Sequence, residues 1–165
     1  MHRLKSDRNA NRILKDLAPY LHSVRLSENV YYLNAAGRER VGGGKPLKKT
    51  HQIEHYLMRN SLYIALGCPA TWRNEVKLAV KGEVSVVADA LFAMSCVYHI
   101  IEVDHTQKMS VNREKARKYR RLIELGVFEK QPKFIWVTTT EYRRKQLTTL
   151  FDGLKVTVYL AKDFI

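Results

Sequence analysis

The sequence predicts an α+β fold in which helices flank a single mixed β-sheet. Two observations support this fold class. The chain has 165 residues, of which 45% are hydrophobic, enough for one core and a small appendage. From residue 50 onward its apolar segments follow the order helix, three strands, helix, strand, helix, strand. Consecutive strands favour antiparallel pairing, whereas strands reached through helices favour parallel pairing.

The first elements are a basic helix and a short hairpin. Ser6 can cap a helix that we expect over residues 7 to about 22. Alternating apolar residues predict strands over residues 24–26 and 30–33, joined by turn residues 27–29. A helix followed by a hairpin resembles the end of a winged helix, in which the helix enters a DNA groove. Alternatively, both elements pack on the core as ordinary secondary structure.

We divide the chain into three parts. Residues 1–41 form a partial winged-helix-like DNA-binding element, residues 42–49 a linker, and residues 50–165 the main domain. The linker belongs to a stretch over residues 37–49 that is rich in glycine and basic residues, as flexible linkers are. The two helices that should precede the last helix of a winged helix are absent. Either a second copy in a homodimer completes the module, or the sequence has been trimmed.

Apolar and turn residues place the elements of the main domain. A helix is predicted over residues 50–66, because Gly67, Cys68 and Pro69 then end it. A second helix is predicted over residues 111–125, capped by Ser110 and ended by Gly126. The other predicted elements are a helix over residues 140–150 and strands over residues 72–80, 83–94, 96–103, 134–138 and 155–160.

Positive charge is concentrated in the two flanks of the chain. The net charge is +13, and it is distributed as +7 over residues 1–50, −1 over residues 51–110 and +7 over residues 111–165. Such a surface attracts polyanions, so DNA is the partner we expect. The candidate DNA contacts are Arg8, Arg12 and Lys15 in the first helix, Arg25 in the hairpin, and Arg113, Arg117, Arg120 and Arg121 in the second basic helix.

Other classes of protein are disfavoured. No apolar run approaches the roughly 18 to 20 residues of a membrane-spanning helix, so we expect no membrane partner. The beginning of the sequence lacks the apolar stretch of a secretory signal, and Cys68 and Cys96 lack metal-ligand spacing. We therefore expect a reducing, cytoplasmic location.

Acidic residues end hydrophobic runs in the near-neutral centre. Glu102 and Asp104 stand at i and i+2 of a predicted strand and so project to the same side. Asp89 lies 13 residues before Glu102, which suits two adjacent antiparallel strands. Carboxylates gathered in this way hold Mg²⁺ in metal-dependent nucleases. The candidate metal ligands are Glu75, Asp89 and Glu102. Alternatively, Glu75 and Asp104 form ion pairs with Arg73 and a neighbouring lysine.

The order of elements in residues 50–165 resembles the restriction-endonuclease-like fold. In that superfamily an Asp near one strand end and a Glu-x-Lys on the next strand hold Mg²⁺ and orient water. Residues 86–91, Val-Val-Ala-Asp-Ala-Leu, resemble the first motif, with Ala88 where proline is usual. Residues 101–104, Ile-Glu-Val-Asp, resemble the second, with Asp104 where the lysine is expected. This resemblance makes Asp89, Glu102, Asp104 and Lys115 the candidate catalytic residues.

More narrowly, residues 10 to 150 are similar to the replication-relaxation family of plasmid and mobile-element proteins. In that family a winged helix ending in Tyr-x-Leu-x-x-x-Gly precedes a His-bearing helix and then Trp-x-x-Glu, Asp-Ala and Glu-Val-Asp motifs and a helix with Lys and Tyr. The matching residues are Tyr31 to Leu33 with Gly37, His55, Trp72 to Glu75, Asp89 with Ala90, Glu102 to Asp104, and Lys115 with Lys118 and Tyr119. The resemblance implies a DNA-binding protein of plasmid or mobile-element replication and DNA relaxation.

Whether the chain is also an enzyme depends on the missing lysine. An aspartate at position 104 cannot donate the positive charge that stabilises a reacting phosphate, so we expect a degenerate nuclease-like scaffold without a required cofactor. The alternative is a Mg²⁺-dependent nuclease or nickase in which Lys115 reaches back from the following helix. Lys115 could instead only extend beside a core face.

A zinc peptidase is a second alternative. Residues 51–55, His-Gln-Ile-Glu-His, fit the His-x-x-Glu-His pattern, in which two histidines one helical turn apart hold Zn²⁺ and the Glu acts as a base. Glu102 or Asp104 could supply a third ligand. The lack of a third-ligand motif and the excess of positive charge count against this alternative.

Overall fold

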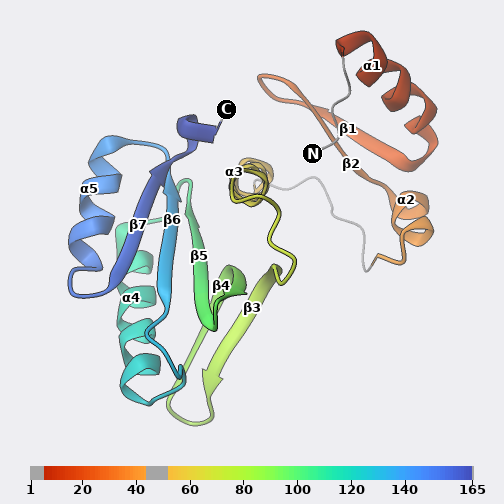
Figure 1. The fold of residues 1–165 in the computed structure, drawn as a ribbon. Coiled ribbons are helices and arrows are strands. Elements are labelled where there is room, and N and C mark those ends of the chain that lie inside the picture. Colours follow the sequence, from red (N-terminus) through yellow and green to blue (C-terminus); the bar gives the residue numbers. More distant parts are fainter. Residues whose placement is uncertain (1–5, 44–51, 165) are drawn as a thin grey trace. The chain divides into compact units, whose positions relative to one another are not determined.

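The computed structural model describes residues 6–43 and 52–164 of the chain. Its contacts divide the chain into two compact units, Met1–Ile53 and Glu54–Ile165 (Figure 1). The first unit contains helices and a two-stranded sheet, and the second contains a five-stranded sheet with the candidate site. None of the helices within the described ranges is both long and apolar enough to cross a membrane.

The first unit begins with helix α1 (Asp7–Asp16), which Ser6 caps by accepting a hydrogen bond from the backbone N–H of Asn9. A 3₁₀ helix, η1 (Ala18–Tyr20), follows. The expectation that the first helix continues to His22 is wrong. It ends early because Pro19 lacks the N–H that a further helical turn would need.

A β-hairpin and a second helix complete the first unit. Strands β1 (Leu21–Arg25) and β2 (Asn29–Leu33) pair antiparallel, which confirms the predicted hairpin. Helix α2 (Ala35–Arg40) then occupies the start of the glycine-rich and basic stretch over residues 37–49, because the Asn34 side chain caps it by accepting from the backbone N–H of Gly37 at 2.9 Å. Residues 44–49 of that linker lie outside the described residues.

The predicted elements of the main domain are confirmed, with bounds that differ by a few residues. They are α3 (Ile53–Ala65), β3 (Arg73–Val80), β4 (Val84–Met94), β5 (Val97–Asp104), α4 (Met109–Glu124), β6 (Lys133–Thr138), α5 (Glu141–Leu150) and β7 (Lys155–Leu160), followed by the 3₁₀ helix η2 (Ala161–Phe164). Ser110 does not cap α4, because the helix begins at Met109, two residues before the predicted start, and its N-cap residue is Lys108.

The five strands form one mixed sheet in the order β3-β4-β5-β6-β7. Strands β3, β4 and β5 are antiparallel neighbours, whereas β5–β6 and β6–β7 are parallel pairs. Each parallel connection passes through a helix, α4 or α5, as parallel pairing requires. The α+β fold predicted from the sequence is therefore the observed one.

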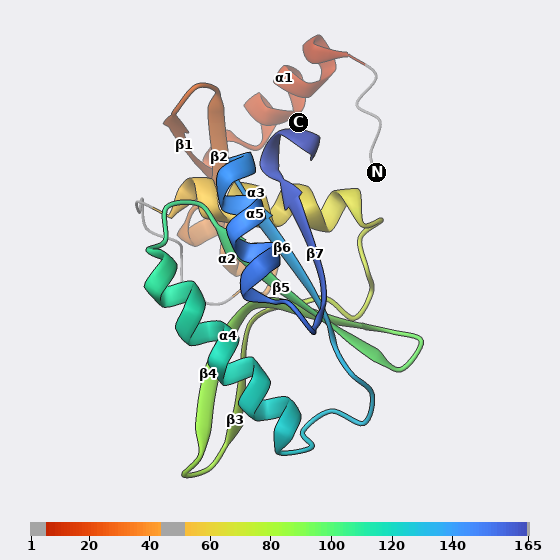
Figure 2. The same ribbon diagram turned by 90° about the vertical axis from the view of Figure 1, so that its left-hand side faces the viewer.

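Helices cover both faces of the sheet. Helices α4 and α5 lie on one face, where Tyr119 and Leu147 pack with Phe134 in a first hydrophobic cluster (Figures 1 and 2). Helix α3 lies on the other face, where Leu62 packs with Val103 in a second cluster. Because both faces are covered, the central strands β5 and β6 are almost entirely buried and consist largely of β-branched and aromatic residues.

Candidate functional site

The site forms where β4 separates from β5. Pairing of these strands runs from Met94 opposite Val97 to Ala90 opposite Ile101. Beyond that point the Asp89 carboxylate, instead of a strand backbone, accepts the Val103 backbone N–H at Oδ2, at 2.8 Å.

The side-chain alternation of β4 shifts at the same residue. Val86 and Ala88 belong to the first hydrophobic cluster, whereas Ala90 and Phe92 belong to the second. In the pairing of β3 with β4, Asp89 and Glu75, which lies opposite it, are not register partners. The φ of Glu75 is +54°. Irregularities of this kind re-aim side chains at sheet edges and active sites.

Asp89, Glu102 and Lys115 form what we call the acid–lysine cluster. The carboxyl groups of Asp89 and Glu102 lie close enough for each to shift the pKa of the other. The Lys115 ammonium donates to Glu102 Oε2, and its Nζ atom lies 3.9 Å from Asp89 Oδ2. Strands β4 and β5 supply the two acids, and helix α4 supplies the lysine. The structure thus brings three of the predicted catalytic residues together.

Two further side chains fix the acid–lysine cluster. The Tyr119 hydroxyl donates to Glu102 Oε1, and His55 Nε2 lies 3.4 Å from Asp89 Oδ1. Tyr119 stands one helical turn after Lys115 on α4, so one face of the helix presents both donors to Glu102. Glu102 is fully buried, whereas the Asp89 and Lys115 side chains are each 17% exposed.

The environment separates the acidities of the two carboxyl groups. Burial raises the pKa of Glu102 well above its ordinary value, the negative charge of Asp89 raises it further, and Lys115 offsets only part of this. Burial would also raise the pKa of Asp89, but hydrogen bonding to His55 and the charge of Lys115 outweigh it and lower that pKa to about 2. The pair therefore favours one proton, carried by Glu102, and one negative charge, carried by Asp89.

Asp104 has a different environment. Its fully buried carboxylate forms a bidentate ion pair with Arg143, with Nε–Oδ2 and Nη2–Oδ1 distances of 2.5 Å. It also accepts hydrogen bonds from Asn112 at 2.9 Å and from Thr138 at 2.8 Å. These contacts tie the end of β5 to α4, β6 and α5. A catalytic role for Asp104 remains a prediction, and its contacts describe a structural one.

Glu75, the third predicted metal ligand, is also engaged elsewhere. Its side chain is 65% exposed, and Oε1 lies 3.7 Å from Arg59 Nη1, which also donates to the Asp89 backbone carbonyl at 3.4 Å. The expected alternative of an ion pair is observed, with Arg59 in the place of Arg73. Within residues 6–43 and 52–164, no three His, Cys, Asp or Glu side chains are grouped so that they could hold a metal together.

A pocket of about 620 Å³ gives access to the acid–lysine cluster. It is lined by Asp89 and Lys115 together with residues of β4 and the first three turns of α4, including Glu114 and Lys118. The exposed edges of the cluster therefore face a surface through which a phosphate group can approach.

The predicted DNA contacts fall into two groups, one in each unit. In the first unit, Arg8, Arg12 and Lys15 line a shallow hollow along α1, while Arg25 lies on the hairpin and donates to Asn29. In the second unit, Arg113, Arg117 and Arg121 are exposed and repeat every four residues along α4. Arg120 differs, since its guanidinium donates to the backbone carbonyls of Leu150 and Asp152.

The histidine pair of the zinc alternative is only partly described. His51 lies outside the described residues, and His55 contacts Asp89. The peptidase hypothesis therefore gains no support from the described residues.

The sequence analysis named Asp89, Glu102 and Lys115 as candidate site residues, but it listed His55 and Tyr119 only as residues that match family motifs and not as contacts of the two acids. The i, i+4 spacing of Lys115 and Tyr119 was a signal that both face one strand. The pairing of Arg143 with Asp104 had no local signal, because the two residues are 39 positions apart.

Comparisons with known proteins give a family and two similar folds. A sequence model of the replication-relaxation family matches residues 1–138. No curated protein matches the sequence significantly. Protein VC1899 from Vibrio cholerae is 15% identical over 97% of this chain and 41% of that one, with a TM-score of 0.48. Can2 from Sulfobacillus thermosulfidooxidans, solved with cyclic tetra-adenylate, is 14% identical over 92% and 41%, with a TM-score of 0.44. This chain spans less than half the length of either protein.

Proposed function

Because the chain belongs to the replication-relaxation family, we propose that it is a DNA-binding protein of plasmid or mobile-element replication and DNA relaxation. The charge of the molecule supports this proposal, since +13 on 165 residues attracts a polyanion over long distances. Contacts to phosphates supply the larger part of the affinity and little of the sequence preference.

Among the proposed DNA contacts, the exposed arginines on α4 have the strongest structural support. Arg113, Arg117 and Arg121 form one stripe beside the pocket that leads to the acid–lysine cluster. Arg117 and Arg121 form surface ion pairs with Glu114 and Glu83, and such exposed pairs exchange readily for phosphate because each contributes little. Arg120 is not one of these proposed DNA contacts, because its guanidinium joins α4 to the end of α5.

The salt dependence of DNA affinity tests this proposal. Each phosphate neutralised on duplex DNA contributes about 0.9 to the slope of log affinity against log salt. We expect the triple variant Arg113→Gln, Arg117→Gln, Arg121→Gln to lower the slope by about 2 to 3. The matched control is Lys77→Gln, Lys81→Gln, Lys130→Gln, which removes the same charge from exposed positions outside α4. Equal slopes for the two variants would show that α4 does not contact DNA.

A second candidate function, hydrolysis of a phosphodiester bond, is favoured by one observation. The Lys115 ammonium contacts both acids of the cluster, so it supplies from α4 the positive charge that Asp104 cannot supply from β5. An ammonium at this position can stabilise negative charge on a reacting phosphate. His55 and Tyr119 hold Asp89 and Glu102 in place while the pocket admits the substrate.

The donor set fits a hard divalent cation such as Mg²⁺. Asp89 and Glu102 would hold it through carboxylate oxygens, and one or two carboxylates are usual for Mg²⁺, which keeps several waters. A bound Mg²⁺ would neutralise phosphate charge and lower the pKa of a water molecule. Because Glu102 favours its protonated form, a cation must displace that proton. Binding should therefore strengthen as the pH rises.

Two measurements test the second function separately from DNA binding. Calorimetry with Mn²⁺ at pH 6 and pH 8 should show tighter binding at the higher pH, with release of a proton. Nicking of supercoiled DNA with Mg²⁺ or Mn²⁺ should be lost in Asp89→Asn and in Lys115→Met. It should persist in Lys118→Met, which removes a lysine from the same pocket outside the cluster. Cleavage that survives in Asp89→Asn would mean that the cluster is not the catalytic centre.

A further inference from the structure

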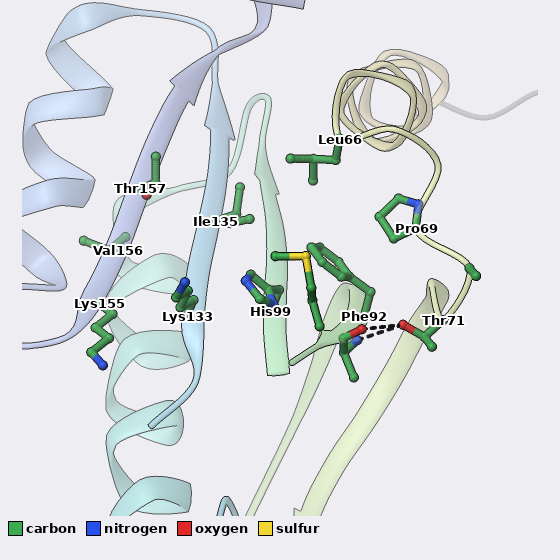
Figure 3. A pocket seen from close by; sticks show the side chains of 13 residues that line it. Leu66, Pro69, Thr71, Phe92, His99, Lys133, Ile135, Lys155, Val156 and Thr157 are labelled. Carbon is green, nitrogen blue, oxygen red and sulfur yellow. Dashed lines mark hydrogen bonds between the residues drawn. The ribbon is translucent and has the colours of Figure 1, made fainter. Parts of the chain in front are cut away.

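A second pocket, of about 660 Å³, lies in the second unit on the sheet face that carries α3 (Figure 3). It is lined by the loop that follows α3 and by the strands β4 to β7. It shares no residue with the acid–lysine cluster, and its volume is in the range of small-molecule sites, about 300 to 1,000 Å³. The proposed function does not use this pocket.

One side of the pocket is cationic. His99, Lys133 and Lys155 are register partners on the neighbouring strands β5, β6 and β7, so their side chains stand in one row on the same face. Neither lysine forms an ion pair within the described residues, and the pocket lining contains no acidic side chain. Lys133 and Lys155 lie on neighbouring strands, and both line a pocket without a counter-charge, so both would attract an anion bound there.

The other side is apolar and fixed in shape. Trp72, Phe92 and His99 form a column of rings, with centroid distances of 5.8 Å and 4.5 Å and interplanar angles of 15° and 8°. Thr71 both donates to the Ala93 carbonyl at 2.9 Å and accepts from the Ala93 N–H at 3.0 Å, which fastens the loop wall to β4 (Figure 3).

The apolar wall is open to a ligand. Met94, one of the lining residues, is 57% exposed, a high fraction for a large apolar side chain beside a pocket. Leu66 and Pro69 lie across from the sheet in Figure 3. A planar apolar group can therefore enter between the loop and the strands.

His99 adds a polar group between the two sides. Its Nδ1 atom lies 3.2 Å from the Val97 carbonyl, which can only accept, so Nδ1 carries a proton. Burial lowers the pKa of His99, the nearby Lys133 lowers it further, and the Val97 carbonyl offsets part of the shift, so the neutral form is favoured. In that form Nε2 is an acceptor, which suits the exocyclic amino group of a nucleobase.

We propose that this pocket binds a nucleotide, with its phosphate between Lys133 and Lys155 and its base against Met94, Leu66 and Pro69. The nucleotide is either a free mononucleotide or one unpaired residue of a single strand, since both present a phosphate beside a planar base. Packing against Met94, Leu66 and Pro69 accepts any base, whereas the acceptor at His99 Nε2 favours a base with an exocyclic amino group. A phosphate alone would leave the apolar side unused, and a nucleoside alone would leave the cations unpaired.

The proposal is tested by titrating ligands into the full chain. The NMR signal of the Met94 methyl group reports binding. The probes are 2′-deoxyadenosine 5′-monophosphate, inorganic phosphate, 2′-deoxyadenosine and a short oligodeoxyadenylate. We expect saturable shifts of the Met94 signal with the mononucleotide or the oligonucleotide, and weaker ones with phosphate or nucleoside. Shifts with the mononucleotide identify a free-nucleotide site, whereas shifts with the oligonucleotide alone identify a strand site.

Charge-matched variants complete the test. Lys133→Gln with Lys155→Gln should weaken the binding that moves Met94 at least tenfold. Lys77→Gln with Lys81→Gln, which removes the same charge from β3 and its turn, should not. All four lysines are exposed, so the fold should survive in both variants. Three results would each overturn the proposal: a silent Met94 signal with every probe, equal affinity for phosphate and mononucleotide, or equal losses in the two variants.

Discussion

At the scale of single residues, the two acids of β5 differ because of the residues that meet them. Glu102 receives a lysine and a tyrosine from α4 and faces Asp89, so its pKa is raised. Asp104 receives the planar guanidinium of Arg143, which satisfies both carboxylate oxygens. Although they are two residues apart on one strand, Glu102 therefore belongs to the acid–lysine cluster, whereas Asp104 is paired with Arg143.

The Asp104–Arg143 pair should contribute strongly to stability. Replacing Arg143 with Met leaves a buried carboxylate without its cation, and we expect a loss of about 2 to 4 kcal/mol in the free energy of unfolding, because Asn112 and Thr138 remain. The control is Arg144→Met, which breaks only an exposed pair with Glu141 and should cost less than about 1 kcal/mol. Urea unfolding measures both, and equal losses would refute the assignment.

Asp89 should make the stability depend on acidic pH. Its pKa falls from 3.8 to about 2 on folding, so its contribution is fully present above about pH 5 and disappears as the pH falls through 2. We expect Asp89→Asn to cost about 2 to 3 kcal/mol at pH 6 and progressively less towards pH 2.5. Urea titrations at several pH values measure this. A cost that is the same at every pH would contradict the lowered pKa.

At the scale of elements, the site depends on where regular pairing stops. The β4–β5 ladder ends at Ala90 opposite Ile101, and Asp89 continues it with a side chain. Helix α4 then follows β5 closely enough for Lys115 and Tyr119 to reach Glu102. A lysine on a neighbouring helix therefore contacts Glu102, while the strand itself has Asp104 where the motif has a lysine.

Helix α2 offers a test of packing in the first unit. A Cβ atom on the buried Gly37 would lie 2.2 Å from the backbone carbonyl oxygen of Tyr20. We expect Gly37→Ala to destabilise this contact by about 1 to 3 kcal/mol, seen as faster hydrogen exchange of the α2 amides. Ala36→Ser, at the exposed neighbouring position, should leave exchange nearly unchanged. Equal exchange in both variants would show that α2 does not pack against η1 in this way.

At the scale of the whole molecule, the two units differ in how much core they contain. All five strands of the large sheet and both hydrophobic clusters belong to the second unit, whereas Val24 is the one buried large apolar residue among residues 6–43. The same molecule carries basic residues in both units. The arginines and the lysine that we propose as DNA contacts are therefore distributed over both units, whereas the acid–lysine cluster lies in the second unit.

The second unit should fold without the first. We expect the fragment of residues 52–165 to unfold cooperatively in urea, because both of its hydrophobic clusters are complete within it. Its transition, followed by circular dichroism, should lie near the main transition of the full chain. A fragment without a cooperative transition would show that the first unit contributes to this core.

Local sequence patterns were sufficient to predict the elements of the main domain and the side chains available for chemistry. Its hydrophobic periodicity predicted every strand of the sheet, since that pattern is a local property of neighbouring residues. The spacing of Asp89 and Glu102 predicted their meeting on adjacent strands, because antiparallel register follows from the connection. Two local predictions were wrong. The first helix ends before Pro19, which has no backbone N–H to donate. Helix α2, which was not predicted, begins after its N-cap residue Asn34.

The contact partner of each acid, in contrast, depends on how the chain folds in space. The contacts of Asp89 with His55, of Glu102 with Lys115 and of Asp104 with Arg143 join different elements of the chain. Such contacts depend on how helices lie on the sheet, and no periodicity within one element encodes that. The same holds for Lys133 and Lys155, which become neighbours because two parallel strands align.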